Sequence, residues 1–456
     1  MRIVIVGAGV VGSNLAEELS NSGHAVSVVD AGASIIRRLD NRMDVLCVRG
    51  NGAQPSVLRR AGIDDAEMCI AVTSTDEVNV VISMLARKFG VKHKIARLRS
   101  DEYVGPDAML RPEELGIDTA INPESIIVQT LSRIVDIPGA IDASTFAEGQ
   151  VLLVTFNVEE GAPVVGKRLA ELRSTAEASF LIVAVFRGER PIVPRGDDRL
   201  MVNDHVAVIT RCDTIDTMVP LFVARPEPVR RVVVYGATLV GVRLVRELHS
   251  SKKKLERVVL IEPDEDRAEQ AAAELSNDTL VLHGEASDPE VLREAIADHC
   301  DFFFAMSRDD ESNMLAALMA RRHNAHRVAV LSQEPHYVPV LSNIGLDVVL
   351  NPRLVAVGEI LKFIRRGAIH MVTRLRDSEA EVMELEAVPG SQITKHPIKE
   401  IEFPHGGIIG AVLRDGEMLI PNGDCQIVEG ETCVVFALPE AIKRLEKLFS
   451  RKRLFG

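Results

Sequence analysis

Three glycines and one aspartate near the start of the chain have the types and the spacing of a dinucleotide-binding site. Gly7, Gly9 and Gly12 form a Gly-x-Gly-x-x-Gly motif directly after the apolar run 2–6. In such a motif the first glycine permits a tight turn, the second lets the backbone approach a pyrophosphate, and the third lets the helix pack closely on the strand. Asp30 lies 18 residues beyond Gly12, close to the separation expected of an acid that binds ribose hydroxyls.

A strand, a turn and a helix must position these residues. Residues 13–22 have apolar side chains on one helical face, and the apolar run 25–29 ends at Asp30. A pyrophosphate would then meet the helix N-terminus, where free N–H groups and the helix dipole attract negative charge. The other residues predicted to line this loop are Ala8, Val10 and Val11.

The acid also indicates which nucleotide fits. An aspartate, rather than a small residue with an arginine, favours a free 2′-hydroxyl and therefore NAD or NADH over NADP. ATP or ADP presents the same ribose and stays an alternative. The other alternative is that the glycines only form a tight turn between strand and helix, without a ligand.

Two later segments are predicted to line the same crevice, because ligands of a doubly wound sheet sit beyond the carboxyl ends of its strands. Thr73 and Ser74 follow the buried run 69–72, and Arg97 ends the next apolar run. Arg97 is suited to pair with a phosphate. Helix capping by Thr73 and Ser74, and a solvated arginine at the end of a strand, are the structural alternatives.

The chain repeats itself. Residues 2–7 recur at 231–236, and Asn122-Pro123 recurs as Asn351-Pro352, both at an offset of 229. Residues 50–58 also match 284–292, and 76–79 match 310–313. Matches in the same order over such a length indicate two copies of one unit.

The second copy has a weakened motif. Gly236 and Gly241 keep the first and third glycines, but Thr238 replaces the second, and its Cβ is expected to crowd a pyrophosphate. Glu262 stands where Asp30 does, and Val330 is assigned to the position of Arg97. The second site is therefore predicted to be either weaker or structural. The remaining candidate residues of this site are Ala237, Leu239 and Val240.

The predicted fold class is α/β, with two tandem Rossmann-like doubly wound parallel sheets, each followed by a small α+β domain. The predicted domains are 1–123, 140–223, 229–352 and 370–453, with a linker at 220–228. Helical segments 123–136 and 352–365 join each Rossmann-like domain to its small domain. The first has apolar residues on more than one face, so we expect it to pack on a neighbouring unit or subunit.

Composition and missing motifs narrow the function. A net charge of -13 disfavours nucleic acid, because that affinity depends on neutralising phosphates. No apolar run approaches the length of a membrane-spanning helix, so a role at a membrane would require a partner. No catalytic residues and no metal site are predicted, and no large substrate domain follows either Rossmann-like unit. The pattern is typical of a nucleotide sensor rather than an enzyme.

These residues resemble a known family. Both halves combine the glycine motif with a segment like Thr73–Asn79 and a turn like 121–124, as in RCK (KTN) domains. The two-copy form with IARLRSDEY at 95–103 resembles the peripheral subunits of bacterial Trk-type potassium-uptake systems. The resemblance implies a cytoplasmic homo-oligomeric ring beneath a membrane-embedded potassium transporter, peripheral at the cytoplasmic side of the inner membrane, that gates uptake on binding NAD(H) or ATP/ADP.

Two alternatives belong to other classes. One is a two-domain NAD-dependent oxidoreductase, which would change NADH absorbance with a metabolite. The other is a scaffold whose nucleotide is structural and never exchanges.

Overall fold

The computed structural model describes residues 1–105, 108–175, 180–188, 190–250, 255–364, 369–375 and 380–451. The chain forms two compact units. Unit 1 contains Met1–Ile127 and Asn351–Leu361, and unit 2 contains Val128–Leu350 and Lys362–Gly456.

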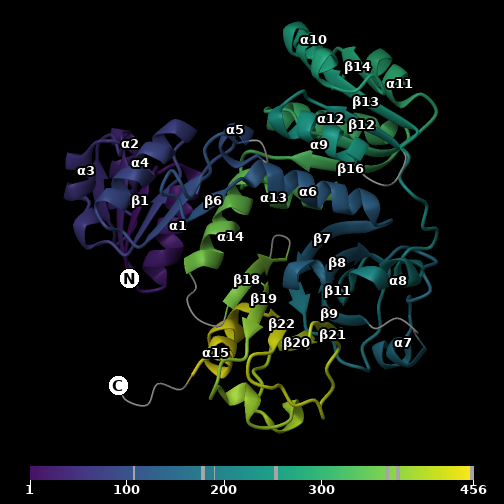
Figure 1. Ribbon diagram of the computed structural model, residues 1–456. Coiled ribbons are helices and arrows are strands. Elements are labelled where there is room, and N and C mark those ends of the chain that lie inside the picture. Colours follow the sequence, from purple (N-terminus) through teal and green to yellow (C-terminus); the bar gives the residue numbers. More distant parts are fainter. Residues whose placement is uncertain are drawn as a thin grey trace. The chain divides into compact units, whose positions relative to one another are not determined.

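Unit 1 is built on a six-stranded parallel sheet of order β3-β2-β1-β4-β5-β6. The order reverses between β1 and β4, which is the switch point where doubly wound sheets bind ligands. The strands are β1 (Arg2–Val6), β2 (Ala25–Asp30), β3 (Leu46–Arg49), β4 (Met68–Ala71), β5 (His93–Arg97) and β6 (Thr119–Ile121). The helices of this sheet are α1 (Val10–Asn21), α2 (Ala33–Asp40), α3 (Pro55–Arg60), α4 (Asp76–Lys88) and α5 (Asp101–Val104) (Figure 1).

Unit 2 contains a second parallel sheet with the same topology, in the order β14-β13-β12-β15-β16-β17. Its strands are β12 (Arg231–Tyr235), β13 (Arg257–Glu262), β14 (Thr279–His283), β15 (Cys300–Ala305), β16 (Ala325–Leu331) and β17 (Val348–Leu350). Its helices are α9 (Leu239–Ser250), α10 (Glu265–Glu274), α11 (Pro289–Ile296), α12 (Asp310–Arg322) and α13 (Tyr337–Asn343). The repeat in the sequence is thus a repeat of topology.

Two five-stranded antiparallel sheets form the small domains of unit 2, in matching orders β7-β8-β11-β9-β10 and β18-β19-β22-β20-β21. The first has β7 (Ala140–Phe146), β8 (Val151–Asn157), β9 (Phe180–Arg187), β10 (Arg190–Ile192) and β11 (His205–Arg211), with α7 (Leu169–Thr175) and α8 (Ile215–Phe222). The second has β18 (Ile369–Arg374), β19 (Glu381–Glu386), β20 (Gly407–Arg414), β21 (Glu417–Leu419) and β22 (Thr432–Ala437), with the helix α15 (Pro439–Phe449). The fold class predicted from the sequence is confirmed.

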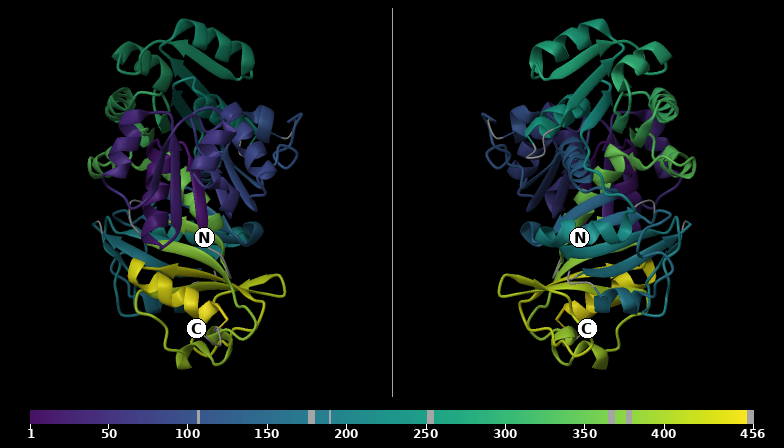
Figure 2. Two further views of the ribbon diagram at one scale, coloured as in Figure 1. Left: turned by 90° about the vertical axis from the view of Figure 1, so that its left-hand side faces the viewer. Right: turned by 90° about the vertical axis from the view of Figure 1, so that its right-hand side faces the viewer.

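The two small domains pack sheet against sheet, which Figure 2 shows as teal strands against green and yellow ones. Gly410 on β20 makes this close approach possible, because a Cβ there would lie 2.2 Å from Cδ1 of Ile209 on β11. Across the same contact the Ala147 N–H donates to Oε2 of Glu384 at 2.8 Å. One face of each sheet is therefore covered by the other small domain.

Two expectations about the connections need correction. The predicted linker is partly helical, since Pro220 lies inside α8 and Phe222 is fully buried, stacked on Phe156 at 5.1 Å between ring centroids. The two crossover helices are α6 (Pro123–Asp136) and α14 (Pro352–Ile364). Residues Asn351–Leu361 belong to unit 1 rather than to the Rossmann-like domain that precedes them.

Part of α6 was expected to pack on a neighbouring unit or subunit, and its apolar side chains Ile127, Val128, Leu131, Ile134 and Val135 are buried. A charge at one of these buried positions is expected to disrupt folding of the chain.

Candidate nucleotide-binding sites

Two glycines of the first motif are required by the backbone itself. Gly7 has a φ of 104°, and a Cβ there would lie 2.8 Å from the Val72 carbonyl oxygen. A Cβ on Gly12 would lie 1.8 Å from the Gly7 carbonyl oxygen. Both glycines bring α1 and the end of β4 against the turn after β1, as close packing of strand and helix demands.

Gly9 differs from the other two. It is the N-cap of α1 with a φ of -63°, which any residue adopts, and no atom lies within 4 Å of a Cβ built there. Nothing in the chain therefore requires glycine at this position. The cap supplies no side-chain hydrogen bond to the helix, so the first turn, which includes Val10 and Val11, is a place for an anion.

Asp30, at the end of β2, faces this turn from the neighbouring strand. Its Oδ2 accepts from the Ala8 N–H and its Oδ1 accepts from the Gly32 N–H, both at 2.7 Å. A carboxylate has about four acceptor positions, so each oxygen keeps capacity for a ribose hydroxyl. The acid thus fixes the loop and remains able to bind a ligand.

Thr73 and Ser74 follow β4 at the switch point. The Thr73 hydroxyl donates to Oδ1 of Asn79 at 2.7 Å, and the same oxygen accepts from the Thr73 N–H at 2.9 Å. The N-cap of α4 is Thr75, and its side chain makes no capping hydrogen bond. Capping of α4 by Thr73 or Ser74 is therefore not what the structure shows.

Asn79 is a residue that the sequence analysis did not assign. It is fully buried, and its amide also donates to the Arg97 carbonyl at 2.8 Å. It thereby joins the ends of β4 and β5 beneath the crevice. Asn313 does the same in the second copy, with Ser307 and the Leu331 carbonyl. The signal in the sequence that could have identified this residue was an asparagine at the same position of α4 and α12, on the buried face of each helix.

Arg97 is neither solvated nor unpaired. Its guanidinium donates to Oε1 of Glu124 at 2.9 Å, and the two side chains are only 15% and 11% exposed. Arg99, two residues further on, is 40% exposed and contacts Oδ1 of Asp76 at 3.5 Å. A phosphate at this end of the crevice would meet an arginine already held by an acid.

The counterpart of Arg97 in the second copy is Leu331, not Val330. Val330 pairs with Ala305 on the neighbouring strand, as Ala96 pairs with Ala71 in the first copy. The assignment of Val330 was therefore one residue off. The inference that the second copy lacks this arginine is unaffected.

In the second motif, the hydroxyl of Thr238 forms hydrogen bonds within the chain. That hydroxyl donates to the Met306 carbonyl at 2.7 Å and accepts from the Gly241 N–H at 3.2 Å. It therefore occupies an N–H of the first turn of α9 that a phosphate would use. The backbone glycines keep their roles, since Gly236 has a φ of 102°.

Glu262 is also satisfied from within the chain. It is 1% exposed, and its Oε2 accepts from the Ala237 N–H at 2.6 Å. Its Oε1 accepts from the Asp264 N–H at 3.0 Å and from Nη2 of Arg267 at 2.6 Å. Arg267 thus occupies an acceptor position that a ribose hydroxyl would need. In the first turn of α9, Leu239 is exposed and Val240 is buried.

The cysteines give no support to thiolate chemistry. Burial raises the pKa of Cys69 and of Cys300 to about 12, so both stay protonated at neutral pH. Within the described residues, no three or more His, Cys, Asp or Glu side chains form a group that could hold a metal ion. In that same part of the chain, no helix has the length and apolar character to cross a membrane.

Comparison with protein families covers both halves of the chain. The TrkA-N domain model matches residues 3–123 and 232–352. The TrkA-C domain model matches residues 153–223 and 382–450.

Curated relatives match along nearly the whole chain. The chain is 34% identical over 455 residues to the Trk system potassium uptake protein TrkA of Halomonas elongata, with 98% of each chain covered. It is 33% identical over 462 residues to the TrkA protein of Vibrio alginolyticus, with all of both chains covered. Among solved structures, the GsuK RCK domain and the GsuK channel bound to NAD each align with a TM-score of 0.62 at 18% identity. Both alignments cover 98% of this chain, with 94% and 78% of the GsuK chains, and they show a shared fold.

Proposed function

The chain belongs to the TrkA family of Trk-system potassium uptake proteins, and we propose that it is the nucleotide-sensing regulatory subunit of such a system. It binds NAD or NADH, or alternatively ATP or ADP, in the first crevice. It assembles as a homo-oligomer beneath a membrane-embedded potassium transporter subunit and gates potassium uptake. Its place is the cytoplasmic side of the inner membrane, held there by its partner. The domain division 1–123, 140–223, 229–352 and 370–453 is part of this proposal.

The observation that carries the proposal is the unexplained glycine at position 9. Gly7 and Gly12 are explained by contacts inside the chain, but Gly9 has open space around its missing side chain. A ligand that needs close backbone approach accounts for it. Asp30 supports the same site, because its oxygens keep acceptor capacity at the end of the neighbouring strand. The oxidoreductase alternative makes a different prediction, because it requires that the protein oxidise NADH when a metabolite is added.

Replacing Asp30 with alanine tests the ribose acid. We expect the affinity for NADH to fall about tenfold, because hydrogen bonds to a charged acceptor are lost and water compensates only in part. Isothermal titration of the full chain measures this. Glu262→Ala is the matched control at the second acid and should leave the tightest NADH binding unchanged. Equal affinities for wild type and Asp30→Ala would remove Asp30 from the site.

Gating requires the membrane partner. Vesicles that contain the transporter subunit, with and without this chain, should take up potassium at rates that differ, and the difference should depend on the added nucleotide. NAD, NADH, ATP and ADP are compared one at a time. Uptake rates that are the same with all four nucleotides would contradict a nucleotide sensor and would favour the scaffold alternative.

An exposed apolar pair indicates where chains meet. Val81 and Met84 on α4 are 41% and 52% exposed. Leu315 and Leu318 occupy the same positions on α12, at 47% and 39% exposure. Residues three apart share one helix face, so both halves present the same apolar face to solvent. Because a repeated surface suits contacts between repeated units, we assign this face to assembly between copies of the chain.

A charge on both faces should break this assembly. Met84→Lys combined with Leu318→Lys is expected to lower the mass in solution to that of one chain, because lysines cannot be buried unpaired. Thermal stability and NADH affinity should stay at wild-type values, since both side chains are exposed. Sedimentation equilibrium measures the mass. Val428→Lys, at a residue that is 54% exposed elsewhere, is the control. An unchanged mass for the double variant would exclude this face.

A further inference from the structure

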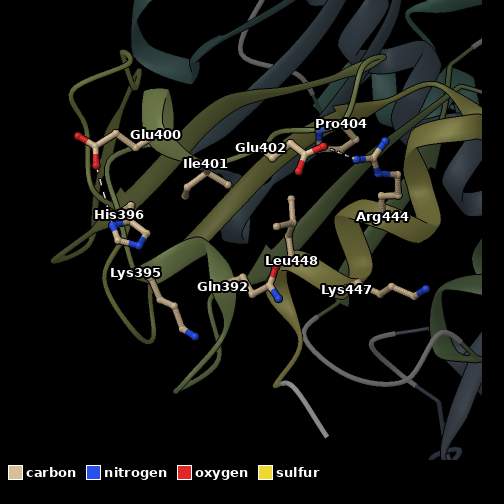
Figure 3. Close-up of a pocket in the computed structure, with 10 residues that line it drawn as sticks. All are labelled: Gln392, Lys395, His396, Glu400, Ile401, Glu402, Pro404, Arg444, Lys447 and Leu448. Carbon is tan, nitrogen blue, oxygen red and sulfur yellow. Dashed lines mark hydrogen bonds and ion pairs between the residues drawn. The ribbon is translucent and has the colours of Figure 1, made fainter.

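The second small domain has a pocket that the nucleotide proposal does not use. It has a volume of about 440 Å³ and lies between α15 and the loops that carry the 3-10 turns η4 (Gln392–Thr394) and η5 (Ile398–Glu400). Figure 3 shows Ile401 and Leu448 in its middle, with Lys395 and Lys447 on opposite sides. We propose that this site, the α15 pocket, binds a small organic phosphate with an apolar part.

Three cationic side chains, Lys395, Arg444 and Lys447, line the pocket against two carboxylates, Glu400 and Glu402, so the balance of charge favours an anion. Among the described residues, neither Lys395 nor Lys447 has an acidic partner. Arg444 forms an ion pair with Glu402 at 3.4 Å, and these side chains are 57% and 93% exposed. An exposed pair of this kind holds its partners weakly, so the guanidinium is available to an incoming ligand. Two ammonium groups and a guanidinium fork suit a phosphate, which offers several oxygens and two charges.

The middle of the pocket is apolar. Leu448 is 8% exposed and Ile401 is partly exposed, and both lie between the two lysines in Figure 3. Apolar surface beside a small number of polar groups is typical of a small-molecule site. It predicts that a ligand with an aromatic or aliphatic part binds better than inorganic phosphate.

The loops of the pocket are held in place by hydrogen bonds. The Ile398 N–H donates to the Cys425 carbonyl at 3.0 Å, and the Lys399 N–H donates to the Gly423 carbonyl at 2.9 Å. The helix side is fixed by the buried Leu445 and Phe449. Binding therefore needs no ordering of these loops, which lowers its cost.

The first small domain shows that the fold does not require these cations. Phe222 and Phe449 end the corresponding helices α8 and α15, both fully buried. Counted back from them, Arg444 corresponds to Thr217 and Lys447 to Pro220.

The loop side of the pocket differs in the same way. Counted from the turn glycines Gly161 and Gly390, whose φ angles are 85° and 79°, Lys395 corresponds to Gly166. The three cations of the α15 pocket are thus absent from the corresponding positions 166, 217 and 220 of the first small domain.

Titration with phenyl phosphate tests the proposal on the full chain, with NAD present at saturation to fill the first crevice. Phosphorus NMR or calorimetry should show one site per chain. Lys395→Gln with Lys447→Gln should weaken binding about tenfold, by loss of two charged contacts. Lys443→Gln, an exposed residue on α15 outside the pocket, should bind as the wild type does. NADH affinity should be the same in all variants, which separates this site from the nucleotide site.

Three outcomes would overturn the proposal. The first is no binding of phenyl phosphate at millimolar concentration. The second is equal binding by the double variant and by Lys443→Gln. The third is equal affinity for inorganic phosphate and phenyl phosphate, which would show that the apolar residues contribute nothing.

Discussion

Replacing Gly9 with valine is expected to abolish nucleotide binding in the first crevice and to leave the stability of the fold unchanged. Gly9 has a φ of -63° and open space around an added Cβ, so the empty chain accommodates a side chain there. The ligand does not, because the pyrophosphate passes this backbone closely. Overpacking and lost hydrogen bonds together predict a loss of about a hundredfold or more in affinity.

Gly12→Ala is the matched contrast, within the same motif. Its Cβ would lie 1.8 Å from the Gly7 carbonyl oxygen, so α1 must move away from β1. Overpacking of this kind costs about 3 kcal/mol of folding stability. Thermal unfolding and NADH titration of both variants separate the two effects. If Gly9→Val binds NADH as tightly as the wild type, or unfolds at the lower temperature expected of Gly12→Ala, the ligand explanation of Gly9 is wrong.

The fold was predictable because the pattern in the sequence was repeated. Three features occur twice in the same order: a glycine turn, an apolar run ending in an acid, and Asn-Pro before a helix. Each occurrence therefore supports the interpretation of the other. Within the small sheets, an alternating apolar pattern is clear in β8, β9 and β11 and in their counterparts β19, β20 and β22. The strands β7 and β18 were missed, because each adjoins a crossover helix and the strand pattern 140–146 has few strongly apolar residues. Asp415-Gly416 is a hairpin-turn signal in the sequence, and it lies between β20 and β21 in the structure.

The details of the site were less predictable, because they depend on contacts between distant residues. Glu124 follows Arg97 by 27 residues, and only the sheet brings them to 2.9 Å. Arg267 was not predicted as a site residue for the same reason, although its hydrogen bond occupies an acceptor position of Glu262. A residue type and a spacing predict which groups face a crevice. They do not predict which of those groups another side chain already occupies.

The second crevice is expected to gain nucleotide affinity when its internal partners are removed. Thr238→Gly frees the Gly241 N–H and the space above it. Arg267→Ser removes the guanidinium that now lies 2.6 Å from Glu262. Replacing a threonine cap by glycine costs only a few tenths of a kcal/mol, and after Arg267→Ser the buried Glu262 keeps the Ala237 and Asp264 N–H donors.

The measurement is made in the Gly9→Val background, where the first crevice is blocked and any NADH binding reports the second. Each substitution should raise the affinity about tenfold and the pair about a hundredfold, as restored hydrogen bonds to a charged carboxylate and to a helix N-terminus predict. Arg246→Ser is the control, since that arginine pairs with Glu274 on the exposed surface. An affinity that stays immeasurable in the triple variant would show that the second crevice is closed by its backbone, and that Thr238 and Arg267 are not what excludes the ligand.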